Sequence, residues 1–142
     1  MTVTTRWEHF PHEADVGVRG FGETQAQAYE QAAMALTAAI TDIATVEPKS
    51  KMQVFCDAHD AELLLVEWLN LLVFEMATRR MLFSRFEVQL LPDHHLTAQV
   101  WGEAIEVARH HPATEVKGAT YTELKVAQQP DGSWLAQCVV DV

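Results

Sequence analysis

The chain has 142 residues, of which 49% are hydrophobic and 21% are charged. These proportions exclude a disordered chain and predict one folded domain over residues 1–142. No apolar run reaches the roughly 18 residues of a membrane span, and the N-terminal residues lack a secretory-signal pattern, so we expect a cytoplasmic protein without membrane contact. The formal net charge of −10 argues against dominant nucleic-acid binding, because phosphate binding relies on clustered Lys and Arg.

Two short extended segments precede the first helix. The first is "WEHF", residues 7–10. In the second, "DVGVRGFG", Val16 and Val18 fall on one face and Gly17 and Arg19 on the other. This alternation has the period of a β-strand.

The segment "TQAQAYEQAAMALTAAI" predicts an amphipathic helix. Thr24 is the expected N-cap, and Gln27 three residues later completes a capping-box pattern. The apolar stripe is rich in alanine, which lets a helix approach a sheet closely. Its members are Tyr29, Ala32, Ala33, Leu36 and Ile40.

A strand and a second helix follow. "KMQVFCD" alternates apolar and polar residues as a half-buried strand does. Asp60 is the expected N-cap of "AELLLVEWLNLLVFEMATRR", which is apolar almost all round and is therefore expected to be largely buried. Its polar exceptions are Glu62, Glu67, Asn70 and Glu75.

The remainder of the chain is rich in strand patterns. "RFEVQLL" and "LTAQVWGE" are joined by "PDHH", and "TYTELKVAQQ" and "SWLAQCVVDV" are joined by "PDG". Both pairs predict hairpins, and Asp-Gly is the stronger turn signal. The polar stretch "AIEVARHHPATEVKGA" between them is expected to be a surface loop. The element order predicts an α+β fold, a single domain with a mostly antiparallel sheet covered by two helices.

Cys56 and Cys138 are the only cysteines. Both lie in apolar, strand-like contexts. We expect two buried free thiols in a reducing compartment rather than a disulfide or a metal pair.

His12 and Asp15 stand three residues apart at the entry to a strand. Histidine and carboxylate ligands suit divalent metals, and carboxylate oxygens suit hard ions such as calcium. In the alternative interpretation, Asp15 accepts backbone N–H bonds in a turn and His12 is a surface residue. The spacing alone leaves both open.

The ends of two other segments carry further candidates. Lys117 precedes a glycine in a loop, where functional side chains are common, although a solvated lysine is the simpler interpretation. Asp141 follows the apolar run "CVV", and the carboxylate of Val142 would lie beside it. These anionic groups are either frayed ends or, if the strand is held in the sheet, ligands for a hard cation.

The histidine pairs offer little chemistry, and catalytic motifs are absent. Neighbours in an extended segment point apart, so His94–His95 and His110–His111 are poor chelating pairs. The sequence has no P-loop, CxxC, HExxH or G-x-S-x-G motif. We find no convincing nucleophile and base set.

The segment "HEADVGVRGFG", residues 12–22, resembles the signature that opens the archease family. The likeness continues in order through the Ala-rich helix, "ELLLVEWLNLLVFE", Gly102-Glu103, "EVKGATYTEL" and the ending "WLAQCVVDV". Each motif is short, but their order along the whole chain makes the resemblance specific. Glu13 and Gly118 depart from the residues most frequent in the family, Thr and Ala.

The resemblance implies a small non-catalytic cofactor protein with the strand–helix–strand–strand fold of archeases. Such proteins assist RtcB-type RNA ligases in tRNA splicing and RNA repair. They promote guanylylation of the ligase with GTP and support multiple turnover.

The resemblance also implies a divalent cation site, which is assigned to calcium in the family. Carried over, its ligands are Asp15, Asp141 and a main-chain or terminal oxygen of Val142. Lys117 matches the family lysine expected to face the ligase. His12 has either a supporting role behind the ligands or a structural one.

Two functions of other classes remain as alternatives. A metal-dependent hydrolase would use the same His12, Asp15 and Asp141 cluster, but it needs a base and a pocket that the sequence does not reveal. A general chaperone or RNA-binding adaptor is the other, and the negative net charge argues against its RNA-binding form.

Overall fold

The computed structural model describes residues 4–142, which form eight strands and three α-helices. The strands are β1 (Arg6–His12), β2 (Asp15–Gly22), β3 (Ser50–Asp57), β4 (Met81–Leu91), β5 (His95–Ala104), β6 (Gly118–Ala119), β7 (Lys125–Gln128) and β8 (Trp134–Asp141). The helices are α1 (Gln25–Ile40), α2 (Ala61–Arg79) and the single turn α3 (Val107–His110), with a short 3₁₀-helix at Ile43–Thr45. The predicted α+β class is confirmed.

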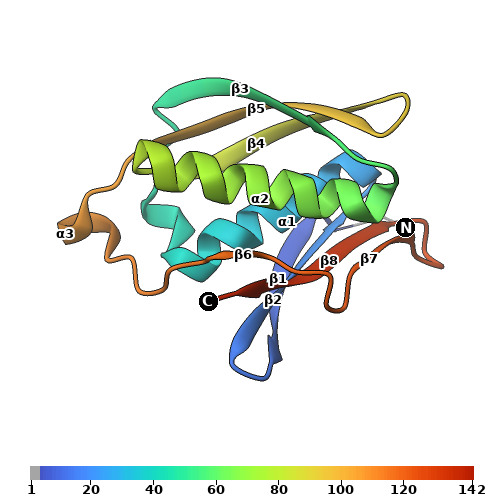
Figure 1. Cartoon of the computed structure of the whole chain (residues 1–142), viewed down its shortest axis with the longest axis horizontal. Helices are drawn as coiled ribbons and strands as arrows, with labels where there is room; N and C mark the ends of the chain where they lie inside the picture. Colours follow the sequence, from blue (N-terminus) through green and yellow to red (C-terminus); the bar gives the residue numbers. More distant parts are fainter. Residues whose placement is uncertain (1–3) are drawn as a thin grey trace.

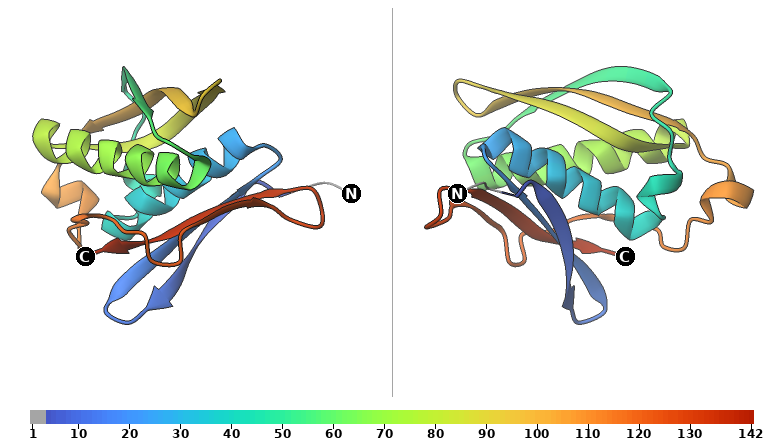
Figure 2. Two further views of the ribbon diagram at one scale, coloured as in Figure 1. Left: turned by 45° about the vertical axis from the view of Figure 1, so that its right-hand side comes forward. Right: turned by 180° about the vertical axis from the view of Figure 1, so that it is seen from behind.

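The strands divide into two antiparallel sheets, where the sequence pattern suggested one. The larger has the order β1-β2-β8-β6, with β7 also paired to β8, and the smaller has the order β3-β5-β4. The two long helices lie between the sheets, as Figures 1 and 2 show. Each helix therefore buries two faces, which explains why α2 is apolar almost all round.

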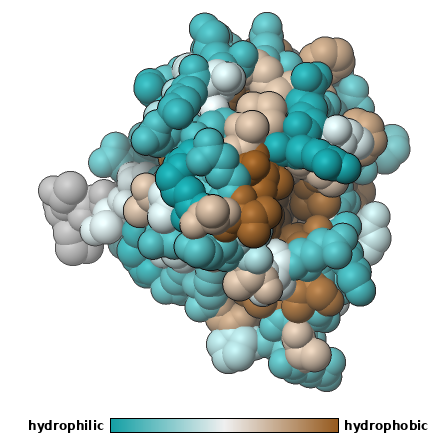
Figure 3. All heavy atoms as spheres, turned by 90° about the vertical axis from the view of Figure 1, so that its left-hand side faces the viewer, coloured by the Kyte–Doolittle hydropathy of each residue, from teal (hydrophilic) through white to brown (hydrophobic). Residues whose placement is uncertain are grey.

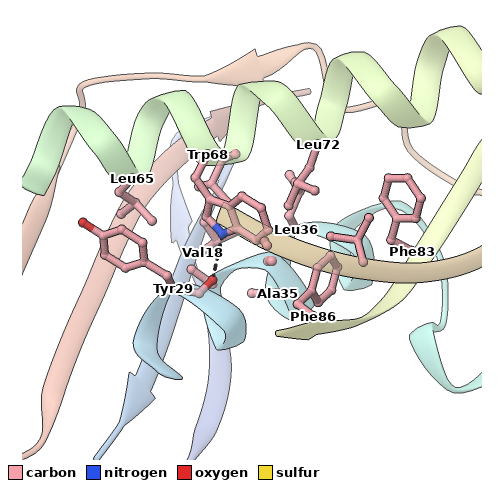
Figure 4. Close-up of a cluster of buried hydrophobic side chains, with 14 of the residues drawn as sticks. Val18, Tyr29, Ala35, Leu36, Leu65, Trp68, Leu72, Phe83 and Phe86 are labelled. Atoms are coloured by element: carbon pink, nitrogen blue, oxygen red, sulfur yellow. Dashed lines mark hydrogen bonds between the residues drawn. The ribbon is translucent and has the colours of Figure 1, made fainter. Parts of the chain in front are cut away.

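One hydrophobic core fills the space between the layers. Figure 4 shows its centre, where Trp68 of α2 lies among side chains from α1, β2 and β4. The Trp68 indole Nε1–H donates to the carbonyl oxygen of Tyr29 at 3.0 Å, and its ring meets Phe86 edge to face. The bond satisfies the one polar atom of a fully buried indole.

Both predicted helix caps are confirmed. The Thr24 side chain accepts from the Gln27 N–H at 3.1 Å, and the Asp60 side chain accepts from the Leu63 N–H at 2.8 Å. The Gln27 side chain reaches back to the N–H of Glu23 rather than to that of Thr24. These bonds satisfy donors that the first helical turn leaves without partners.

The two predicted hairpins also form, as β4–β5 and β7–β8. The stretch between them, expected to be a surface loop, is only partly so. It contains α3, whose His110 side chain is buried, as is Val116 further along. The physical reason is a buried ion-pair network, described below.

Both cysteines are free, as expected, but only Cys138 is buried; Cys56, which was also expected to be buried, is half-buried. Burial raises the pKa of each thiol to about 12. The thiolate form, which is the nucleophile, is therefore scarce at neutral pH. None of the helices in the described part of the chain has the length and apolar character that a membrane crossing requires.

Candidate functional site

The β1–β2 hairpin positions Asp15. The strands run in register from Arg6 opposite Phe21 to His12 opposite Asp15, and the Glu13–Ala14 turn joins them. Glu13 adopts a left-handed backbone conformation with φ of 56°. The tight turn thus places Asp15 at the tip of the larger sheet, beside His12 on the neighbouring strand.

Strand β8 brings the C-terminal residues to the same tip. β2 and β8 are paired from Gly22 opposite Trp134 to Val16 opposite Val140, and the next residues along the two strands are Asp15 and Asp141. The Asp15 carboxylate Oδ1 accepts the main-chain N–H of Val142 at 3.2 Å. Residues from opposite ends of the sequence therefore meet, and β8 is held in the sheet rather than frayed.

The segment leading into β6 adds Lys117 on the other side of β8. Its N–H donates to the carbonyl oxygen of Asp141 at 2.8 Å, and Gly118 pairs with Asp141 in the sheet. The side chains of Lys117 and Asp141 are exposed. One lysine and two aspartates thus share one accessible end of the larger sheet, which we name the carboxylate tip (Asp15, Asp141, Val142 and Lys117).

Two contacts, one of them buried, hold the Lys117 segment. Val116, next to Lys117, is 7% exposed. It helps line an apolar groove with residues of α1, α2 and β4, among them Ile40, Val73, Met76 and Met81. Figure 3 shows this apolar hollow on the face at the left-hand end of Figure 1. Beyond Lys117, the Asn70 side chain of α2 accepts the N–H of Ala119 at 2.8 Å, which accounts for the polar residue in an apolar helix.

A second polar cluster surrounds Glu103, which is buried at the end of β5. Arg109 donates to both carboxylate oxygens, at 2.9 and 2.6 Å, and the N–H of Glu47 donates to one at 2.7 Å. A further partner is Nε2 of His110, at 3.0 Å. We name Glu103, Arg109 and His110 the Glu103 network.

The hydrogen bonds of His110 define its tautomer. Nδ1 lies 2.8 Å from the main-chain nitrogen of Glu106 and must accept from its N–H. Nε2 therefore carries the proton and donates to Glu103. The carbonyl of His110 also accepts from the Thr41 hydroxyl. Together these bonds fix α3 against the end of α1 and give His110 a structural role.

The Glu103 network is expected to make stability depend on acidic pH. The Arg109 hydrogen bonds, followed by the N–H of Glu47, hold the pKa of Glu103 well below its usual value of 4.5. A lowered folded-state pKa contributes stability above the unfolded-state value, and that stability is lost as the pH falls through the folded-state value. We expect the difference in unfolding free energy between wild type and Glu103→Gln to be constant above about pH 5 and to shrink below it.

Urea unfolding between pH 7 and the acid limit of folding measures this difference. Glu87→Gln is the matched control, because Glu87 pairs with Arg85 at 3.0 Å on an exposed surface. Exposed pairs contribute little, so the control should differ little from wild type throughout. A Glu103→Gln difference that stays the same into acid would contradict the assignment.

The remaining candidate residues, the two adjacent histidine pairs, do not form a binding or catalytic site. His94 and His95 lie at the β4–β5 turn, and His95 contacts Asp57 at 3.6 Å. His111 is exposed while its neighbour is buried. Among residues 4–142, no group of three or more His, Cys, Asp or Glu side chains is arranged to hold a metal ion.

Comparisons with known proteins match nearly the whole chain to one family. The model of the Archease protein family matches residues 7–142. "Protein archease" of Pyrococcus abyssi is 36% identical over 140 residues, covering 96% of this chain and 99% of its own. The archease of Methanopyrus kandleri is 36% identical over 139 residues, with 96% and 99% covered.

A solved structure agrees with the fold. The solution structure of Methanobacterium thermoautotrophicum protein 1598 superposes with a TM-score of 0.83 at 31% identity. The match covers 96% of this chain and 98% of that one. The two proteins therefore share one architecture from end to end.

Proposed function

The chain belongs to the archease family, and from this premise we propose that it is a non-catalytic activator of an RtcB-type RNA ligase in tRNA splicing and RNA repair. In this role it promotes guanylylation of the ligase with GTP and supports multiple turnover. We place this activity in the cytoplasm.

The carboxylate tip is the observation that carries the proposal. Its four residues come from β2, β8 and the segment before β6, yet they converge on one exposed end of the sheet. Side chains of both charges at an accessible end suit contact with another protein and with phosphate groups. No binding cleft is needed for that role.

The tip also suits a divalent cation, which we propose is calcium. Residues opposite each other on paired strands present their side chains on the same face, where two carboxylates repel. A hard cation removes that repulsion and takes oxygen ligands. Asp15, Asp141 and a main-chain oxygen of Val142 would hold it, and other oxygen ligands must come from water or from the partner, since six to eight are usual.

Within the complex, the protein's own groups have distinct tasks. The two aspartates would concentrate negative charge at the tip, and Lys117 would present a mobile ammonium beside it. A bound cation would supply positive charge to phosphate oxygens of GTP. Contact of this end with the ligase would favour the ligase conformation that reacts with GTP.

A guanylylation assay tests the function directly. A purified RtcB-type ligase from the same genome is incubated with labelled GTP and metal, with and without a sub-stoichiometric amount of this protein. We expect faster formation of the ligase–GMP adduct and more than one ligation per ligase. If neither the adduct nor the turnover changes with a ligase that is active alone, the proposal fails.

The same preparation tests the hydrolase alternative. The isolated protein is incubated with phosphoester substrates and divalent metal. We expect no turnover. Turnover that disappears in Asp15→Asn would favour a hydrolase instead.

Asn70 is expected to position Lys117 for this activity. Asn70→Leu removes the acceptor of the half-buried Ala119 N–H, and leaving such a donor unsatisfied costs about 1 kcal/mol, the lower end of the range for buried donors. We expect a higher concentration of this variant for half-maximal stimulation of the ligase. Asn70→Asp keeps the acceptor oxygen and should restore the half-maximal concentration. If Asn70→Leu is less stable but stimulates at the wild-type concentration, Asn70 is purely structural.

A further inference from the structure

The outer edge of β3 has a feature that the proposed function does not use. β3 pairs with β5 along its whole length, from Ser50 opposite Gly102 to Asp57 opposite His95. Within residues 4–142, no group hydrogen-bonds the main chain of β3 on its other side. This edge therefore presents a row of N–H and C=O groups that can pair with another strand.

The opposite edge of the same sheet is covered by α1. The Glu30 carboxylate accepts the N–H of Val88 on β4 at 2.7 Å, and the Thr37 hydroxyl donates to the carbonyl of Phe83 at 2.7 Å. The burial of Glu30 raises its pKa, so the helix places a partly buried carboxyl group on this edge. Side chains of α1 thus bond two main-chain groups on the β4 edge, whereas the β3 edge has no such bond within residues 4–142.

β3 also lacks most of the features that prevent edge pairing. It contains no proline, and its pairing with β5 has no bulge. Its inward-facing side chains, at positions 52, 54 and 56, are uncharged. Phe55 on the outward face is 79% exposed. Protected edges usually carry proline, bulges or inward-pointing charges.

We propose that this chain forms a homodimer in which β3 pairs antiparallel with β3 of a second copy. With Val54 opposite its own equivalent, Lys51 lies opposite Asp57, and the two-fold axis repeats this pair. Gln53 then lies opposite Phe55 on the same face. The edge is therefore complementary in charge to itself.

Other registers lose this match. A shift by two residues in one direction places Lys51 opposite Phe55 and Asp57 opposite Lys49, which lies outside β3 and already pairs with Glu47 at 3.2 Å. The same shift in the other direction places Lys51 opposite His59 and Asp57 opposite Gln53. A shift by one residue would turn the apolar inner face of one copy against the exposed face of the other. The Lys51–Asp57 register forms its charged pairs between residues of β3 itself, which favours it over the shifted registers that keep the faces aligned.

The dimer leaves the carboxylate tip free. Figure 1 shows β3 in the smaller sheet, across the two helices from β6 and the C-terminus. Because only an eight-residue edge is shared, the interface is smaller than that of a stable complex. We expect a dissociation constant roughly between micromolar and millimolar.

Sedimentation velocity of the full chain, over about 10 µM to 1 mM, tests the dimer. Wild type should show a reversible monomer–dimer equilibrium in this range. Lys51→Asp and Asp57→Lys each turn two attractive pairs into two repulsive ones, so each should weaken dimerisation about tenfold. The double variant Lys51→Asp/Asp57→Lys should restore the wild-type value.

Mixing the two single variants gives a second, independent readout. Each variant edge then meets the opposite charges on its partner, so a heterodimer should form at concentrations where neither variant dimerises alone. Glu87→Lys, on the far edge of the same sheet, is the matched charge reversal and should leave the equilibrium unchanged. Lys51 and Asp57 are both exposed. Thermal unfolding is used to check that each variant folds.

Two results would overturn the proposal. One is a wild-type chain that stays monomeric over the whole concentration range. The other is a dimer that neither single reversal weakens, which would place the interface elsewhere. The outcome is independent of ligase activation, which is measured separately.

Discussion

Asp15→Asn and Asp141→Asn are each expected to reduce stimulation of the ligase at least about tenfold, without loss of the fold. Asparagine keeps the shape of aspartate, and at position 15 it keeps an oxygen that can accept the N–H of Val142. The substitutions therefore remove charge rather than structure. Because two neighbouring carboxylates repel, each variant should be at least as stable as wild type without metal.

The guanylylation rate measures the loss of stimulation, and thermal unfolding measures the stability of each variant. Asp93→Asn is the matched control: Asp93 lies in the β4–β5 turn with φ of 63°, a conformation that asparagine tolerates. It should stimulate as wild type does. If both tip variants stimulate normally, the carboxylate tip has no part in activation.

The cation is tested separately by its effect on stability. A ligand that binds the folded state raises the midpoint of thermal unfolding with concentration. Calcium should do so for wild type and for Asp93→Asn but not for the two tip variants. If stimulation depends on both aspartates but calcium does not raise the unfolding midpoint, the carboxylate tip still acts as the ligase contact, and calcium binding at the tip is excluded.

Gly20→Ala is expected to be the most damaging single change in the larger sheet. A Cβ at Gly20 would lie 2.2 Å from the carbonyl oxygen of Ala28 and 2.4 Å from the nitrogen of Ala32. Both atoms belong to the backbone of α1, so the whole helix must move away from β2. Overpacking of this kind costs about 3 kcal/mol at its upper end.

Gly17→Ala on the same strand is the matched comparison. The three atoms nearest to its Cβ would all belong to the ring of Phe10, the closest at 2.3 Å. Phe10 is half-buried, and its ring can move without shifting backbone. We expect a loss of about 1 kcal/mol. Equal losses for the two variants in urea unfolding would show that the close approach of α1 is not what requires Gly20.

Local patterns anticipated much of the fold. The caps Thr24 and Asp60 begin the helices where the sequence places them, and Asp131–Gly132 lies in the turn of the β7–β8 hairpin. Each depends on residues a few positions apart, so each can be recognised without the tertiary structure. The alanine-rich stripe of α1 likewise predicted a close approach to a sheet, and the structure shows that this approach is to β2.

Other features had no local signal. The β1–β2 turn uses Glu13 in a left-handed conformation, where glycine or asparagine would have marked a hairpin. The Glu103 network was also missed, since a glutamate after a strand and a nearby Arg-His pair are individually ordinary. Burial makes them significant, and burial arises only when α3 folds against α1 and β5.

The sequence by itself determined the two long helices, the main strands, the free thiols, and the kinds of charge available at the candidate site. Only the tertiary structure decided which of those charges meet. Asp15 and Val142 are 127 positions apart, and the β2–β8 register brings them within hydrogen-bonding distance. That register follows from the faces that two strands must bury together against α1, a long-range condition that no single segment contains.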